Sequence, residues 1–271
     1  MMLNDLFDPR KSLNLFDLKE KFIALKQLIV QNKLPKVLML TGDKGLGKST
    51  LIFHLMHYYF DKNNYDEINN KINNSSFHYE FLNNLFPNII YLGNQNLNNL
   101  KIEDVRKLKN DILKSSISKK KRFIILDDIE TQSVNSLNAL LKLIEEPSEN
   151  NYFILINNKS QKILETIKSR AIDIQIILND QTKNKITKSL LNYYNQESSL
   201  SIDIVKLSPG NFLKFNYILN EKKIDINDSF LITIKKILNI YKKEKNLLYR
   251  DLLLFHTEYY FQNKNIQNNF D

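Results

Sequence analysis

The chain has 271 residues, 42% of them hydrophobic and 25% charged, which is typical of a globular protein with room for two or three domains. It contains no cysteine, which excludes disulfides and cysteine-ligated zinc, and no apolar run of about 18 residues that could span a membrane. The net charge of +9 favours phosphate-rich partners such as nucleic acid, although a lysine-rich composition of AT-rich origin explains it equally well. Because residues 1–20 do not form a secretory signal, we expect a cytoplasmic protein without a membrane partner.

Strands and helices alternate through the first two thirds of the chain. Short apolar runs predict buried strands, and apolar residues at helical spacing predict the helices between them. In chain order we expect a helix at 22–30, a strand at 37–40, a helix at 49–59, a loop-rich insertion at 61–87 with one helix at 79–85, a strand at 89–92, a helix at 102–115, a strand at 123–126, a helix from 134 that stops at Pro147, a strand at 153–156, a short helix at 163–168 and a strand at 172–176. This alternation predicts an α/β domain with a five-stranded parallel sheet and helices on both faces.

The last third of the chain reads as helices without strands. The expected helices are at 190–194, 204–207, 212–219 and 230–241. Breaks in the pattern near Asn179 and Asp225 then divide the chain into an α/β domain at 1–178, a small helical domain at 179–224 and a short helical C-terminal domain at 225–271.

A complete phosphate-binding motif follows the first predicted strand. Residues 42–49 read GDKGLGKS, which fits G-x-x-x-x-G-K-[ST], and they lie between a strand and a helix as this motif requires. The glycines let backbone N–H groups surround phosphates, Lys48 brings a positive charge to the β- and γ-phosphates, and the Ser49 hydroxyl can hold Mg²⁺. The candidate nucleotide-binding residues here are Gly42, Gly45, Gly47, Lys48, Ser49 and Thr50. A chance glycine loop and a degenerate, non-binding site remain the alternatives.

Two acidic residues end the third predicted strand. Asp127 comes directly after the apolar run 123–126, where a carboxylate can join Ser49 around Mg²⁺. Alone, an acidic pair after a strand is usually a cap or a loop, but the motif at 42–49 makes it specific. Asp128 is the weaker candidate for a hydrolytic base, because aspartate is one methylene shorter than glutamate. ATP and Mg²⁺ are therefore the expected cofactors.

A pair of histidines and a basic run can each be explained by structure alone as well as by function. His54 and His57 lie one helical turn apart, but no cysteine or carboxylate pattern completes a metal site, so packing is the expected role. The basic run 119–122 before a strand is either a solvated loop or a DNA contact.

The central part of the chain resembles the AAA+ clamp-loader family. Residues 138–147, NALLKLIEEP, closely resemble the signature N-A-L-L-K-x-x-E-E-P of that family. Four more segments are similar to family motifs: 101–106 to the box before the signature, 153–158 to the strand ending in sensor 1, 166–171 to T-I-x-S-R-C, and 207–211 to the G-S-P-G element of the lid. The resemblance covers roughly residues 34–215 and implies a P-loop AAA+ fold with a helical lid at 179–224 and a collar-like domain at 225–271.

The resemblance also implies roles for two further residues. Asn157 would sense the γ-phosphate, and Arg170 would act as an arginine finger in the ATP site of a neighbouring subunit. A turn residue at a strand end and a surface arginine are the respective alternatives. The sequence departs from hydrolysing relatives in having Asp128 where they have glutamate and Gly210 near their sensor 2 arginine. These departures favour the delta-prime class, which binds ATP but hydrolyses it weakly or not at all.

By the same resemblance, the chain would be part of a hetero-oligomeric ring in the DNA polymerase III holoenzyme. Its partners would be gamma/tau-type and delta-type subunits, the sliding clamp and, through the complex, primed DNA. Two alternatives stay open: a gamma/tau-type subunit that hydrolyses ATP itself, which the intact phosphate-binding motif supports, and a non-replicative AAA+ remodelling ATPase.

Overall fold

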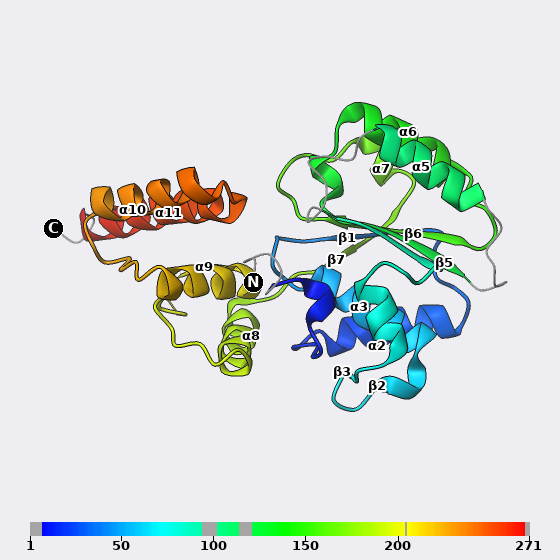
Figure 1. The fold of residues 1–271 in the computed structure, drawn as a ribbon, viewed down its shortest axis with the longest axis horizontal. Coiled ribbons are helices and arrows are strands. Elements are labelled where there is room, and N and C mark those ends of the chain that lie inside the picture. The colour runs from blue at the N-terminus through cyan, green and yellow to red at the C-terminus, as the bar shows by residue number, and fades with distance from the viewer. Residues whose placement is uncertain (1–6, 94–101, 114–120, 204, 269–271) are drawn as a thin grey trace. The chain divides into compact units, whose positions relative to one another are not determined.

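The computed structural model describes residues 7–93, 102–113, 121–203 and 205–268 (Figure 1). The chain divides into two compact units, residues 1–178 and 179–271. Whether the second unit divides again at residue 225 stays a prediction. Within the described ranges, none of the helices is both long and apolar enough to cross a membrane.

The first unit is built on a five-stranded parallel sheet, as the sequence predicted. The strand order is β4-β5-β6-β1-β7, so β1 lies between β6 and β7 inside the sheet. The strands are β1 (Val37–Thr41), β4 (Ile89–Leu92), β5 (Arg122–Leu126), β6 (Asn151–Asn157) and β7 (Ile172–Gln175). The helices are α2 (Lys19–Val30), α3 (Lys48–Phe60), α4 (Ser76–Leu82), α5 (Ile102–Leu113), α6 (Val134–Glu145) and α7 (Glu165–Lys168), with short 3-10 turns η1 (Pro9–Lys11), η2 (Lys62–Asn64) and η3 (Ile129–Thr131).

The sheet is covered by helices on both faces because its inner strands are apolar on both sides. Leu38 and Leu40 of β1 face a core built with α2, α3 and α4. Val37 and Met39 face a second core built with α5, α6 and α7. Figure 1 shows these two helical layers on opposite sides of the sheet. Because β5, β6 and β1 are neighbouring parallel strands, their carboxyl ends and the polar residues there meet at one edge of the sheet.

The insertion at 61–87 is more ordered than the sequence predicted. It contains a short antiparallel pair, β2 (Tyr65–Asp66) with β3 (Lys71–Ile72), which the spacing of apolar residues did not reveal. Its helix α4 begins at Ser76 instead of Tyr79, because the Ser75 hydroxyl caps the helix by accepting a hydrogen bond from the His78 N–H at 3.1 Å.

The second unit contains α8 (Asp180–Tyr193), α9 (Pro209–Glu221), α10 (Phe230–Glu244) and α11 (Leu247–Asn268). The predicted helix at 204–207 is wrong for residues 205–207, where the backbone is an irregular connection; Ile204 lies outside the described residues. Helix α11 was not predicted. The buried Asn216 side chain of α9 fixes the preceding loop by accepting from the Ser199 N–H at 2.7 Å and donating to the Glu197 carbonyl at 2.8 Å.

Three histidines of α3 and α4 are buried: His54 and His57 on α3, and His78 on α4. The rings of His57 and His78 are within hydrogen-bond distance, with Nε2 and Nδ1 3.2 Å apart. His54 lies against the Tyr65 hydroxyl and the Ser12 carbonyl, both at 3.1 Å. Burial lowers the pKa of His54 to about 4 and that of His57 to about 3, so both are neutral at pH 7. This supports the packing role expected for the pair on α3.

We expect acid to destabilise the first unit through these histidines. Their pKa values are near 6.5 in the unfolded chain and lower in the folded one, so the unfolded chain binds more protons between pH 6.5 and 4. Stability present above pH 6.5 is then lost on acidification, at about 1.4 kcal/mol per pH unit for each histidine. Urea unfolding followed by circular dichroism at several pH values measures this. His57→Gln should flatten the dependence, and an unaltered slope would exclude His57 as its source.

Candidate nucleotide-binding site

The loop at 42–49 connects β1 to α3 in a conformation that only glycines allow. Gly45 and Gly47 have φ of +88° and +85°, in the left-handed region that residues with a Cβ rarely adopt. At Gly42, a Cβ would lie 2.5 Å from the Ile176 carbonyl oxygen of the neighbouring segment. Helix α3 then begins at Lys48, so its N-terminal N–H groups and positive dipole end face the loop. This is the geometry of a phosphate-binding cradle.

Lys48 is folded into this loop. Its side chain is buried, and Nζ donates to the carbonyl oxygens of Gly42 at 2.6 Å and Asp43 at 2.8 Å. Burial lowers the pKa of Lys48 to about 8, and the negative charges of Asp127 and Glu130 oppose the shift. The Lys48 ammonium thus donates to neutral carbonyl oxygens, and an anionic phosphate entering the loop would be a stronger hydrogen-bond acceptor for it.

Ser49 and Asp127 are brought together as predicted. The Ser49 hydroxyl, on the first turn of α3, donates to Asp127 Oδ2 at 2.6 Å. Burial and the neighbouring Asp128 raise the pKa of Asp127, while the hydrogen bond from Ser49 opposes the rise. A hydroxyl and a carboxylate are hard oxygen ligands of the kind Mg²⁺ prefers. Thr50, the remaining loop candidate, lies half-buried beside them on α3.

The donor set fits magnesium held jointly with a nucleotide. Among the side chains that the structure describes, no cluster of three or more His, Asp or Glu residues could hold a metal by itself. Mg²⁺ is usually bound through one or two protein ligands together with substrate phosphates and water, so two ligands at this loop are sufficient.

The end of β6 places two asparagines differently. Asn157 is buried, donates to the Thr41 hydroxyl at 3.4 Å and accepts from the Lys159 N–H at 3.0 Å. Asn158 instead faces the acidic pair, donating to Asp128 Oδ1 at 2.6 Å and to Asp127 Oδ1 at 3.3 Å. The role of Asn157 as a phosphate sensor stays a prediction, and Asn158 is a further site residue that the sequence did not single out.

Asp128 is a constrained residue. It is buried, its backbone has φ of +53°, and its carboxylate is occupied by the bond from Asn158. Two residues later, Glu130 is also buried, and its Oε1 accepts from the Ser160 hydroxyl at 2.7 Å. Because Glu130 acts electrostatically on Lys48, it is a third carboxylate at this edge, beside Asp127 and Asp128, and the sequence analysis did not single it out.

Arg170 follows α7 at a different place in the unit. Its guanidinium pairs with Glu145 of α6 at 2.5 Å and donates to the Thr166 carbonyl at 2.8 Å. About one third of its side chain is exposed. Arg170 is therefore partly accessible and is held by residues of α6 and α7, whereas Ser49 is held by Asp127, which follows β5.

Comparison with known proteins identifies the family. A family model described as DNA polymerase III, delta subunit, matches residues 18–180, which is more than half of the chain. The chain belongs to this DNA polymerase III delta subunit family. The matched region includes the phosphate-binding loop at 42–49 (the P-loop), Asp127, Asn157 and Arg170, so the site described above lies entirely inside it.

Two proteins similar to this chain are named as subunits of DNA polymerase III. A DNA polymerase III subunit delta′ of Buchnera aphidicola is 27% identical over 188 residues, covering 58% of this chain and 54% of that protein. A tau/gamma subunit of Haemophilus influenzae is 32% identical over 98 residues, covering 36% of this chain and 14% of that protein. The chain thus matches about half the length of the Buchnera relative.

A solved structure shows the same fold. The crystal structure of a DNA polymerase III gamma subunit-related protein from Thermotoga maritima has a TM-score of 0.50 and 14% identity, covering 86% of this chain and 82% of that one. The fold predicted from the sequence, a five-stranded parallel sheet with helices on both faces followed by a helical part, is confirmed.

Proposed function

We propose that this chain is a delta-prime-like subunit of a DNA polymerase III clamp loader, which helps ATP-driven loading of the sliding clamp onto primed DNA. The family match over residues 18–180 and the relative named delta′ support this proposal. The partners are gamma/tau-type and delta-type subunits in a hetero-oligomer, together with the clamp and, through the complex, DNA. The single observation that carries the nucleotide part is the Ser49–Asp127 contact beside Lys48.

The cofactors we propose are ATP and Mg²⁺. Backbone N–H groups of the loop and the start of α3 would bind phosphate oxygens, and Lys48 would turn from the loop carbonyls to them. Ser49 and Asp127 would hold Mg²⁺, which neutralises phosphate charge when bound. Asn157 and Asn158 would complete the polar edge from β6.

We propose that the chain's own ATP hydrolysis is weak or absent. Asp128 stands where a hydrolytic base is needed, and its carboxylate already accepts the 2.6 Å bond from Asn158. Its aspartate side chain is also shorter than a glutamate, which limits its reach toward a water molecule. The second candidate, a gamma/tau-type motor, is favoured by the intact P-loop. Turnover by the isolated chain, with a Lys48 variant as blank, distinguishes the two.

Arg170→Ala should impair the assembled complex. An arginine finger contributes a factor of about 10³ or more at the site it serves, so the neighbour's site should become nearly silent. We expect the DNA-stimulated ATPase rate of the complex to fall to the rate that its other ATP sites supply, and the rate of clamp loading to fall as well. The measurement uses the chain mixed with gamma/tau-type and delta-type subunits, clamp and primed DNA from the same organism.

Arg250→Ala is the matched control, because Arg250 is an exposed arginine of α11 paired with Asp251. It should leave the ATPase unchanged. Unchanged activity of the Arg170→Ala complex would reject the finger role alone. Failure of the unaltered chain to enter any complex with these subunits would reject the clamp-loader proposal itself.

A further inference from the structure

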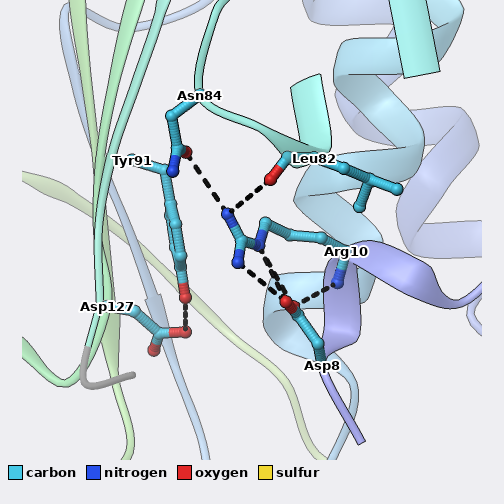
Figure 2. Close-up of polar contacts among 6 residues, drawn as sticks. All are labelled: Asp8, Arg10, Leu82, Asn84, Tyr91 and Asp127. Carbon is cyan, nitrogen blue, oxygen red and sulfur yellow. Dashed lines mark hydrogen bonds and ion pairs between the residues drawn. The ribbon is translucent and has the colours of Figure 1, made fainter. Parts of the chain in front are cut away.

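An arginine from the N-terminal segment is enclosed beside the sheet (Figure 2). Arg10 is 9% exposed, and its Nη2 pairs with Asp8 Oδ2 at 2.7 Å. Nη1 donates to the carbonyl of Leu82, the last residue of α4, at 3.4 Å and to Asn84 Oδ1 in the following loop at 3.3 Å. Asp8 thus neutralises the charge of Arg10. The Nη1 donor of Arg10 is used by Leu82 and Asn84, which lie more than seventy residues further along the chain.

The guanidinium also covers an aromatic ring. Its central carbon lies 5.2 Å from the ring centroid of Tyr91 on β4, a cation–π distance. Phe53 of α3 contacts the same ring edge-on, with centroids 5.2 Å apart. The Tyr91 hydroxyl lies close to Gly93, where a Cβ would be only 2.3 Å from it, so a larger residue at position 93 would clash with the hydroxyl. The Tyr91 ring is therefore held in one position by its surroundings.

The fixed ring directs its hydroxyl at the proposed magnesium site. Tyr91 donates to Asp127 Oδ2 at 3.3 Å, the same oxygen that accepts from Ser49 at 2.6 Å. Burial and the charge of Asp127 raise the pKa of Tyr91. Oδ1 accepts from the Asp128 N–H and Asn158, so the carboxylate is held at both oxygens.

We propose that Tyr91 is a positioning residue of the magnesium site, which holds the Asp127 carboxylate in place together with the Ser49 hydroxyl, and that Arg10 acts through Tyr91. This inference rests on the proposed function, because it assumes that Ser49 and Asp127 bind Mg²⁺ with a nucleotide. The Ser49 hydroxyl can direct a lone pair at the metal while its O–H still donates to Asp127. A second donor on the same Oδ2 further limits the rotation of the carboxylate.

The hydroxyl is testable separately from the ring. Tyr91→Phe keeps the aromatic contacts with Arg10 and Phe53 but removes the donor to Asp127. We expect the Mg²⁺ concentration for half-maximal binding of a fluorescent ATP analogue to rise about three- to tenfold, the range expected for the loss of one hydrogen bond of ordinary net strength. Affinity for the analogue in EDTA should stay within about twofold, since the phosphate cradle is unchanged.

Tyr152→Phe is the matched control, since it makes the same change in β6 of the same sheet at a tyrosine outside the phosphate site. It should leave the Mg²⁺ requirement unchanged. Arg10→Lys provides a second variant, because it keeps the charge but not the planar fork that contacts Asp8, Asn84 and the ring. It should also raise the Mg²⁺ concentration for half-maximal binding. In the double variant with Tyr91→Phe, the change in binding free energy should be smaller than the sum of the changes in the two single variants, because both act through Tyr91.

The outcomes separate the inference from the function on which it rests. Absence of any Mg²⁺-dependent nucleotide binding by the unaltered chain would overturn the proposed function. Normal binding by the unaltered chain, with the same Mg²⁺ requirement in Tyr91→Phe and Arg10→Lys, would overturn the inference alone. An equal loss of affinity with and without Mg²⁺ in Tyr91→Phe would also overturn it, because that pattern indicates general damage to the site.

Discussion

A Lys48→Met variant is expected to lose nucleotide affinity by about 100-fold or more. Methionine keeps much of the apolar stem but removes the charge that would contact the β- and γ-phosphates, and a lost charge-assisted contact of nearly 3 kcal/mol corresponds to that factor. In the free protein, the Lys48 ammonium contacts only carbonyl oxygens among its hydrogen-bond partners in the described structure, Gly42 and Asp43. The variant therefore breaks no ion pair among the described residues, and its main effect should be on the ligand.

Equilibrium binding of a fluorescent ATP analogue in Mg²⁺ measures this loss. Lys44→Met is the matched control, since Lys44 belongs to the same loop but its side chain is exposed. It should bind the analogue within about threefold of the unaltered chain, because an exposed charge is screened by solvent. Equal affinities for the Lys48→Met variant and the unaltered chain would contradict the proposal that this loop binds phosphates.

The parts of the site that are contiguous in sequence could be predicted, and those that depend on strand register could not. Lys48 and Ser49 stand in one motif, and Asp127 ends a recognisable strand. By contrast, whether Asn157 or Asn158 faces the acidic pair depends on which way the last residues of β6 point. The two are adjacent and identical, so the sequence holds no signal that separates them.

The same limit explains the parts of the fold that were missed. Helix α11 has no single apolar stripe, because Leu254 and Phe261 are exposed while Leu252 is buried, so periodicity is a weak guide to it. The β2–β3 pair has two residues per strand, too few to show alternation. Tyr91 reads as an ordinary strand residue until Arg10, from a distant segment, is seen against its ring.

Phe53→Ala should cause the largest loss of stability among these substitutions. Phe53 is 1% exposed on α3, and its ring contacts those of Phe81 and Tyr91 with centroids 5.3 and 5.2 Å apart. Truncating a buried phenylalanine leaves a cavity that the surroundings fill only in part, at a cost of about 3–5 kcal/mol. That is a large share of the roughly 5–15 kcal/mol that keeps a domain folded.

Urea unfolding of the Phe53→Ala variant measures this cost, with Tyr79→Ala as control. Tyr79 is an aromatic residue of the neighbouring α4 that is 65% exposed, so its truncation should change stability by no more than about 0.5 kcal/mol. The milder Phe53→Leu should stay folded and still loosen the ring of Tyr91. If Tyr91 positions Asp127 as inferred, Phe53→Leu should therefore also raise the Mg²⁺ requirement for nucleotide binding. Similar unfolding free energies for Phe53→Ala and Tyr79→Ala would contradict the packing of α3 on which both expectations depend.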